Sequence, residues 1–199
     1  LTIDFRGSTG YGRDFRYALH DEWGHGDVHD LVDGARWAAE QPWSDSRFGV
    51  IGGSYGGYLT LCALVDEPEL WSVGIDRYGD SDLALSYRLG DRIGRLDVER
   101  QMGRPDEPSK APLYRRASPI FDTEKIQAPL LMLHGRKDKR VVPRMTEIMA
   151  RQLEIESKFH EVVWFDDEGH GWERRENQRK AAEKTLDFIL AHLPPTVKS

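Results

Sequence analysis

Short apolar runs alternate with amphipathic stretches along most of the chain. The apolar runs have the length and composition of buried strands and occupy residues 48–51, 72–75, 130–133 and 161–165. The amphipathic stretches have helical spacing and occupy residues 27–41, 54–66, 142–156 and 174–192. A chain of this kind builds a mostly parallel sheet with helices on both faces. We therefore expect a single α/β domain over residues 1–199.

The stretch Gly52-Gly53-Ser54-Tyr55-Gly56-Gly57 lies between a predicted strand and a predicted helix. A G-x-S-x-G motif in this context is typical of a nucleophile elbow, a sharp turn that exposes a serine above the sheet. Glycines are expected around it because a Cβ there would collide with the strand or the helix. The Tyr55 N–H would then stand at a helix N-terminus, where it can face a developing oxyanion.

A serine hydroxyl needs a base to take its proton and an acid to orient that base. Asp138 follows the apolar run at 130–133, and His170 stands between two glycines after the run at 161–165. The carboxyl ends of parallel strands share one edge of a sheet, so Ser54, Asp138 and His170 are predicted to meet there. Each of these two residues has an alternative interpretation: Asp138 as an aspartate in a turn, and His170 as a histidine in a surface loop. Other candidate acids follow an earlier strand: Asp76, Asp80 and Asp82.

Two segments depart from the regular alternation. Residues 1–5 alternate between apolar and polar side chains, which predicts a further strand at the start of the chain. Residues 80–126 contain four prolines and several arginines in an irregular pattern. We expect short helices and loops in this second segment, forming a cap over the active face.

Composition narrows the function classes. The chain has 199 residues and a net charge of −6, which gives a nucleic-acid role no electrostatic support. Its single cysteine excludes a disulfide framework. No apolar run approaches membrane-spanning length and no signal peptide is recognisable, so we expect a cytoplasmic protein without a membrane segment. His25 and His29 have the spacing of a metal pair but no accompanying ligand cluster, so a helix start is favoured there over a metal site.

Four motifs in order resemble the catalytic domain of the prolyl oligopeptidase family of serine peptidases, with its acylaminoacyl-peptidase and dipeptidyl-peptidase branches closest. The motifs are residues 4–12, 52–57, 138–141 and 168–171. The resemblance implies an α/β-hydrolase fold and hydrolysis of short peptides through an acyl-enzyme, without a cofactor. Two alternatives stay open: an esterase or lipase on the same fold, and a non-catalytic scaffold domain with a relic triad.

The resemblance also implies residue roles. Ser54 matches the nucleophile, Asp138 the acid, His170 the base and Tyr55 the residue whose backbone N–H serves the oxyanion hole. The remaining matches concern substrate binding. Arg140 matches a position that in some members binds a substrate carbonyl. The residues around Leu83 and Tyr87 match those that line the pocket for the residue before the scissile bond.

One departure from the family pattern concerns the start of the chain, which resembles the fourth strand of the family's hydrolase domain. The first three strands, a tyrosine that supplies a second oxyanion donor and a propeller domain have no counterpart in this sequence. We therefore expect the chain to be the C-terminal part of a longer protein, with its sheet edge covered by an upstream propeller domain or by a second copy. The isolated chain is expected to be a poor catalyst.

Overall fold

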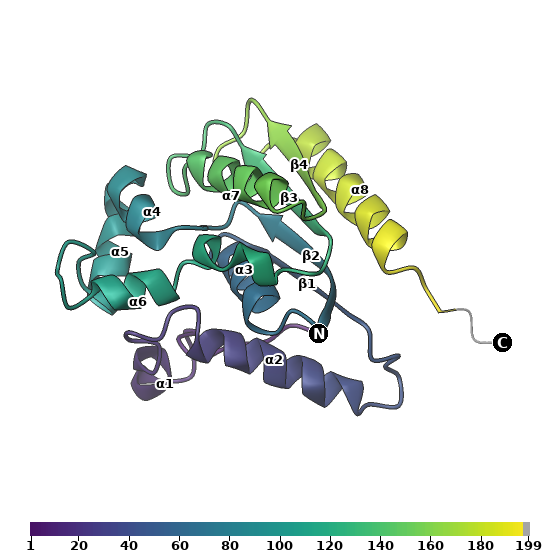
Figure 1. Cartoon of the computed structure of the whole chain (residues 1–199), viewed down its shortest axis with the longest axis horizontal. Helices are drawn as coiled ribbons and strands as arrows, with labels where there is room; N and C mark the ends of the chain where they lie inside the picture. Colours follow the sequence, from purple (N-terminus) through teal and green to yellow (C-terminus); the bar gives the residue numbers. More distant parts are fainter. Residues whose placement is uncertain (197–199) are drawn as a thin grey trace.

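Four parallel strands form the centre of the structure and lie in the order β1-β2-β3-β4 (Figure 1). Their bounds are β1 (Phe48–Gly53), β2 (Trp71–Arg77), β3 (Leu130–Gly135) and β4 (His160–Phe165). The structure, a computed structural model, describes residues 1–196. Since each of the four predicted apolar runs became one of these strands, the parallel sheet expected from the sequence is confirmed.

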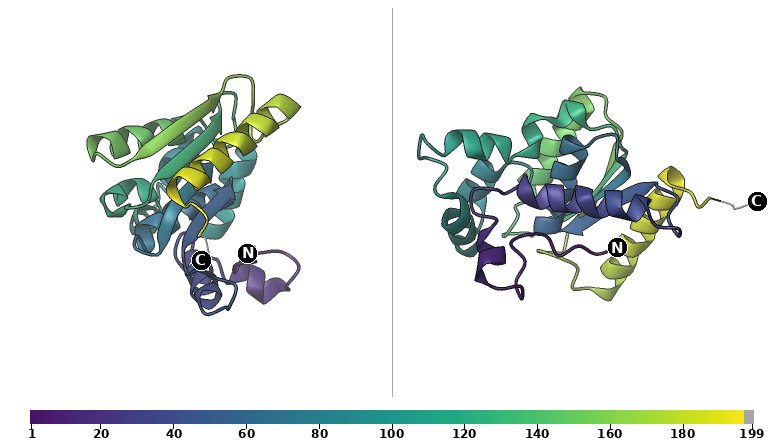
Figure 2. Two further views of the ribbon diagram at one scale, coloured as in Figure 1. Left: turned by 90° about the vertical axis from the view of Figure 1, so that its right-hand side faces the viewer. Right: turned by 90° about the horizontal axis from the view of Figure 1, so that it is seen from below.

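Helices cover both faces of the sheet. One face carries α2 (Gly26–Ala39), α3 (Tyr55–Asp66) and α7 (Arg144–Ile155), and the other carries α8 (Arg175–His192) (Figure 2). Successive residues of β3 alternate between these layers. Leu130 and Met132 pack in the core cluster with α3 and α7, whereas Leu131 and Leu133 pack in the cluster with α8. The result is a core with two apolar layers, one on each side of the strands.

Short helices replace the regular alternation in two places. The first is α1 (Arg13–Tyr17), which follows the opening segment. The second lies between β2 and β3 and contains α4 (Leu83–Leu89), α5 (Arg92–Met102), α6 (Ala111–Arg116) and the 3₁₀ turns η1 (Pro119–Phe121) and η2 (Thr123–Lys125). The irregular composition of residues 80–126 predicted this second group. The three helices α4, α5 and α6 lie together at one end of the molecule (Figure 1).

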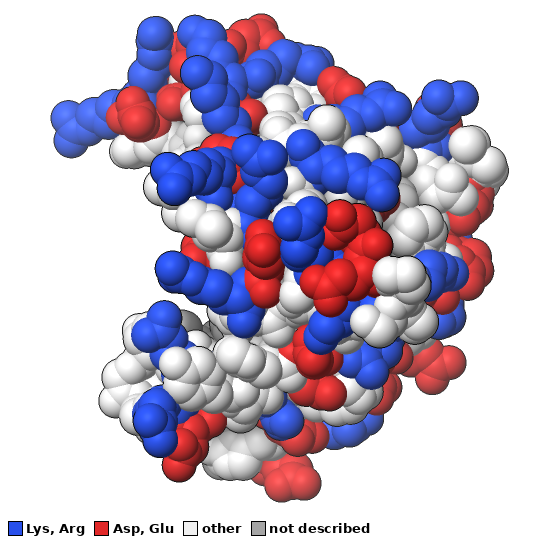
Figure 3. All heavy atoms as spheres, turned by 90° about the vertical axis from the view of Figure 1, so that its left-hand side faces the viewer, with Lys and Arg blue, Asp and Glu red and all other residues white. Residues whose placement is uncertain are grey.

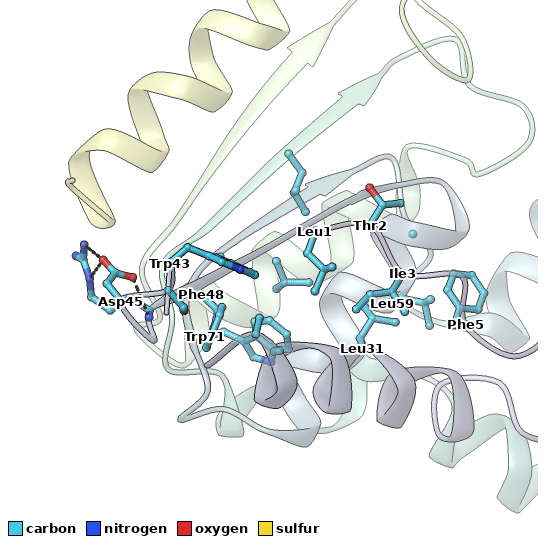
Figure 4. Close-up of a pocket in the computed structure, with 18 of the residues that line it drawn as sticks. Leu1, Thr2, Ile3, Phe5, Leu31, Trp43, Asp45, Phe48, Leu59 and Trp71 are labelled. Carbon is cyan, nitrogen blue, oxygen red and sulfur yellow. Dashed lines mark hydrogen bonds and ion pairs between the residues drawn. The ribbon is translucent and has the colours of Figure 1, made fainter. Parts of the chain in front are cut away.

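The predicted strand at residues 1–5 is wrong, because this segment forms no regular structure. A cavity of about 710 Å³ lies between it and β1, with Leu1, Ile3 and Phe5 on one wall and Phe48 on the other (Figure 4). Alternating residues become a strand only where the backbone pairs with a neighbour. Here the apolar side chains pack on α2 instead, where the Ile3 side chain fills the space a Cβ at Gly34 would need.

The helices carry many charged side chains on their outer faces. The longest, α8, includes lysine, arginine, glutamate and aspartate along its 18 residues. Within residues 1–196, no helix is long and apolar enough to cross a membrane.

Candidate active site

Ser54 occupies the sharp turn between β1 and α3. Its backbone has φ 57° and ψ −120°, a conformation that costs a non-glycine residue on the order of 1–3 kcal/mol. The neighbouring glycines make the turn possible. A Cβ at Gly52 would overlap the backbone of Gly56, and a Cβ at Gly57 would overlap the carboxylate of Asp76. The predicted elbow therefore forms, with its serine at the carboxyl end of a parallel strand.

A continuous chain of hydrogen bonds joins Ser54, His170 and Asp138. The Ser54 Oγ lies 2.7 Å from His170 Nε2, and His170 Nδ1 lies 2.7 Å from Asp138 Oδ2. An ionised carboxylate only accepts hydrogen bonds, so Nδ1 carries the proton and Nε2 presents a lone pair to the serine hydroxyl. The structure thus brings together three residues that are separated by more than 80 and 30 positions in the chain.

The Asp138 carboxylate is buried and fully engaged. Its Oδ1 accepts from the backbone N–H groups of Arg140, at 2.8 Å, and Val141, at 3.0 Å. Burial acts to raise its pKa, but hydrogen bonds from His134 and His170 outweigh burial and lower the pKa to about 2. Asp138 is therefore ionised at neutral pH and able to stabilise a cationic His170.

A second histidine, His134, stands behind the acid and was not singled out from the sequence. It is buried, with Nε2 2.8 Å from the Val141 carbonyl oxygen and 3.4 Å from Asp138 Oδ2. Because a carbonyl only accepts, Nε2 donates, and Nδ1 accepts from the Thr146 hydroxyl at 2.7 Å. The four-residue spacing to Asp138 gives no signal of this contact, which depends on how the loop after β3 turns.

The three other candidate acids hold different positions. Asp82 caps α4 by accepting from Leu85 N at 2.9 Å, and Asp76 accepts from Gly79 N at 2.8 Å. Asp80 lies beside α4. Burial raises the pKa of both Asp76 and Asp80 to about 6. Asp138, and none of these three, is the carboxylate that the structure pairs with His170.

The loop that carries His170 is held by a buried carboxylate, Glu168. It accepts from the N–H groups of Glu173 and Arg174, each at 3.0 Å, and from Asn177 Nδ2 at 2.8 Å. Burial acts to raise the pKa of Glu168, yet these donors lower it. The Glu168 carbonyl also accepts from Lys137 N at 2.9 Å, which joins the base loop to the acid loop.

Tyr78 packs against the imidazole of His170 and was also missed from the sequence. The two rings meet edge to face with centroids 4.9 Å apart, and Trp172 packs on the same tyrosine at 5.2 Å. Tyr78 has φ 46°, an uncommon conformation for a bulky residue. Tyr78 therefore packs beside the imidazole whose Nε2 lies 2.7 Å from Ser54 Oγ.

The Tyr55 backbone is placed as an oxyanion donor would need. Tyr55 is the first residue of α3, so its N–H has no helical carbonyl to bind and adds to the positive end of the helix dipole. Its side chain is anchored below the turn, where the hydroxyl donates to Asp27 Oδ2 at 2.5 Å. Burial raises the pKa of Asp27. This anchor fixes the backbone beside Ser54.

The three substrate-binding candidates differ in what they can offer. Arg140 pairs with Asp91 through Nε and Oδ2 at 3.0 Å, and the Tyr87 hydroxyl donates to Glu99 Oε2 at 3.0 Å. Leu83 is 1% exposed and packs in the core, so its side chain offers a substrate no surface and its predicted role is wrong. Leu83 is the first residue of α4, and its buried side chain packs this short helix against the core.

Metal ligands do not converge in the described part of the chain. Among residues 1–196, no group of three or more His, Cys, Asp or Glu side chains is arranged to hold a metal ion. His25 precedes α2, and its ring packs against that of His29 at 4.4 Å. His29 in turn lies 3.7 Å from Asp66.

Comparisons with known proteins show the family of this chain. The model of the prolyl oligopeptidase family matches residues 1–196. Dipeptidyl aminopeptidase BIII of Pseudoxanthomonas mexicana is 32% identical over 194 residues, which are 95% of this chain and 28% of that protein. The acylamino-acid-releasing enzyme of Arabidopsis thaliana is 31% identical over 180 residues, covering 87% of this chain and 24% of the enzyme.

Solved structures give the same result. A puromycin-hydrolyzing peptidase of Mycobacterium tuberculosis superposes with a TM-score of 0.91 at 26% identity, over 98% of this chain and 30% of that one. The acylaminoacyl peptidase of Pyrococcus horikoshii gives 0.87 at 27% identity, over 98% of this chain and 32% of that one. The expected α/β-hydrolase fold is confirmed. The chain spans about a third or less of the length of these proteins.

Proposed function

This chain belongs to the prolyl oligopeptidase family, and on that premise we propose that it is the catalytic part of a serine peptidase that hydrolyses short peptides. The observation that carries the proposal is the hydrogen-bonded chain from Ser54 Oγ through His170 to Asp138, with 2.7 Å at each step. The proposal assigns the nucleophile to Ser54, the base to His170 and the orienting acid to Asp138.

Acylation begins when Ser54 Oγ attacks the peptide carbonyl carbon and His170 Nε2 takes the hydroxyl proton. The imidazolium that forms is stabilised by Asp138, whose low pKa keeps it anionic throughout. His170 then passes the proton to the leaving amine as the C–N bond breaks. Water repeats the sequence on the acyl-enzyme and releases Ser54 with its proton restored.

The negative charge on the carbonyl oxygen is stabilised by the backbone N–H of Tyr55. A donor at a helix N-terminus is already oriented and costs no rearrangement during the reaction. The Tyr55 hydroxyl bond to Asp27 supports this orientation from below the turn. Loss of one oxyanion donor costs on the order of a hundredfold in rate or more, so this contact matters to turnover.

Peptide substrates are proposed because the named relatives are peptidases. Arg140 and Tyr87 stay the candidates for substrate contact. Three further statements stay predictions. They are a cytoplasmic location, a partner that is an upstream propeller or a second copy, and weak activity of the isolated chain.

Turnover of matched substrates tests the proposal. We expect the protein to hydrolyse aminoacyl amides and short peptides, and Ser54→Ala to abolish this turnover. Hydrolysis of p-nitrophenyl esters with no turnover of amides would favour an esterase instead. Failure of a fluorophosphonate probe to label Ser54 in the full-length protein would favour a non-catalytic domain.

A further inference from the structure

Positive charge is concentrated at two neighbouring segments beside the triad. The loop after β3 has four basic residues and one acidic residue between positions 136 and 140, and the α4–α5 junction has three arginines and one aspartate between positions 88 and 95. The whole chain has a net charge of −6. These two segments therefore carry a local charge opposite to that of the molecule.

The two segments are in direct contact. Arg140 Nε lies 3.0 Å from Asp91 Oδ2 at the start of α5. The glycines on either side of this pair allow a close approach, since a Cβ at Gly90 would lie 3.1 Å from the Arg140 carbonyl oxygen and one at Gly94 would lie 3.4 Å from its side chain. The two segments thus adjoin, and the basic residues of the second segment lie near the loop that carries Asp138.

Five basic side chains of these segments are not held in ion pairs. They are exposed and form no ion pair within residues 1–196: Arg88, Arg92, Arg95, Lys137 and Lys139. We call this set the basic rim. Figure 3 looks onto the side of the molecule where α4, α5 and α6 lie, and Lys and Arg side chains spread over much of its upper half. Because none of these side chains is held in an ion pair, each can bind an approaching carboxylate.

Apolar side chains stand between the arginines of the rim. Leu89 is 48% exposed and Ile93 is 58% exposed, one at the end of α4 and the other in the first turn of α5. A peptide with acidic side chains has groups that can contact the arginines and groups that can contact these apolar side chains. Its carboxylates can bind guanidinium groups in a bidentate manner, and its apolar atoms can cover the two exposed side chains.

We propose that the basic rim selects peptide substrates that carry carboxylates, either on Asp and Glu side chains or at the C-terminus. This inference rests on the proposed peptidase function. Two lysines of the rim flank Asp138, which is bonded through His170 to Ser54, so the rim adjoins the loop that carries the catalytic acid. Charge of one sign around a reaction site raises substrate association about 10- to 1,000-fold at low ionic strength. An acidic face of another protein is the competing occupant, and it would leave peptide selectivity unchanged.

Peptide pairs that differ in one charge test the proposal. One pair exchanges Glu for Gln, and a second exchanges a C-terminal carboxylate for an amide. We expect kcat/KM to favour the charged member of at least one pair by about tenfold at low salt, and the ratio to approach one in about 0.5 M salt because the charges are screened. The pair that responds identifies the source of the carboxylate. Equal turnover within both pairs at low salt overturns the proposal.

Variants that replace arginine or lysine by glutamine show which residues cause the preference. Arg92→Gln with Arg95→Gln should remove the preference, whereas Arg151→Gln with Lys184→Gln should keep it. The control cations are also exposed and form no ion pair within residues 1–196, but they lie in the later part of α7 and in the middle of α8. A preference that survives the first double variant would contradict the rim assignment.

The two proposals can fail separately. The same peptide pairs are bound to Ser54→Ala and their Kd values measured by fluorescence anisotropy. If the full-length wild type hydrolyses no peptide, the peptidase function fails, and the ratio of Kd values still tests the rim. If peptides are hydrolysed but neither the rate nor the Kd depends on the carboxylate, the rim proposal alone fails.

Discussion

His134 Nε2 lies 3.4 Å from Asp138 Oδ2, the same carboxylate oxygen that His170 Nδ1 contacts at 2.7 Å. Two histidines therefore face one buried carboxylate, one from inside the fold and one from the active face. The inner histidine is fixed by Thr146 and by the Val141 carbonyl. The acid is thus held from three sides, by two imidazoles and by the backbone N–H groups of its own loop.

Replacing His134 by Gln should weaken the dependence of stability on pH in the acid range. The folded-state pKa of Asp138 is about 2 and its ordinary value is 3.8, so its ionisation stabilises the fold above pH 4 and this contribution is lost as the pH falls toward 2. The full contribution is about 2 kcal/mol. Removing one donor raises the folded-state pKa of Asp138 toward 3.8, so His134→Gln should be less stable than the wild type above pH 4 and should lose less stability as the pH falls toward 2. Urea unfolding across this range measures the effect.

The control for this experiment is His160→Gln, at the start of β4 and away from Asp138. Its acid dependence should match that of the wild type. Identical acid dependence of His134→Gln and the wild type would show that His134 does not contribute to the low pKa of Asp138.

Ser54→Gly should be more stable than Ser54→Ala. Both variants lose the nucleophile, but alanine keeps a Cβ at φ 57°, where glycine has no steric penalty. We expect a difference of about 1 kcal/mol in the free energy of unfolding, opposite in sign to the usual effect of glycine at a helix start. Chemical denaturation of the two variants provides the measurement. A more stable alanine variant would mean that the turn is not strained.

The glycines after Ser54 should respond differently to alanine. A Cβ at Gly57 would overlap the Asp76 carboxylate and crowd the Arg77 carbonyl, whereas a Cβ at Gly56 meets no atom within 4 Å. Gly57→Ala should therefore lower stability by about 1–3 kcal/mol. Gly56→Ala is the matched control and should be neutral or stabilising by about 0.5–1 kcal/mol, because alanine favours a helix. Equal effects on thermal stability would argue against the close packing at Gly57.

Glu168→Gln should slow catalysis without changing substrate affinity strongly. The glutamine keeps the shape of the side chain but has no charge, and its NH2 group cannot accept one of the two bonds from Glu173 and Arg174. The loop would then hold His170 less firmly, and we expect kcat to fall about tenfold with KM nearly unchanged. Steady-state kinetics separates the two parameters. A rise in KM with constant kcat would place the effect in substrate binding instead.

The elements that sequence patterns predicted well are those determined by local chemistry. The turn at Ser54 needs a strand, glycines and a helix in order, and all are adjacent in the chain. Asp138 and His170 could be predicted because parallel strands bring their carboxyl ends to one edge. The sheet edge was not predictable in the same way. Residues 1–5 have the alternation of a strand, but pairing depends on a neighbour that a local pattern does not specify.

Several of the contacts that were missed join segments far apart in the chain. Glu168 and Tyr78 hold the base, but their partners come from α8, β3 and the segment before α8, which no spacing rule relates. Leu83 was assigned to a pocket by resemblance, and the structure buries it. Whether a side chain at the start of a short helix points inward depends on the packing of the whole cap, which one sequence does not define.

The most direct test of the account is the rate at which a fluorophosphonate probe labels Ser54, with the modified residue identified by mass spectrometry. The hydroxyl reacts quickly only if His170 removes its proton. We predict that wild-type protein is labelled at Ser54 and that His170→Ala and Asp138→Asn are labelled at least about a thousandfold more slowly. Labelling at another residue, or equal rates in the three proteins, would contradict the assignment of these residues as one catalytic unit.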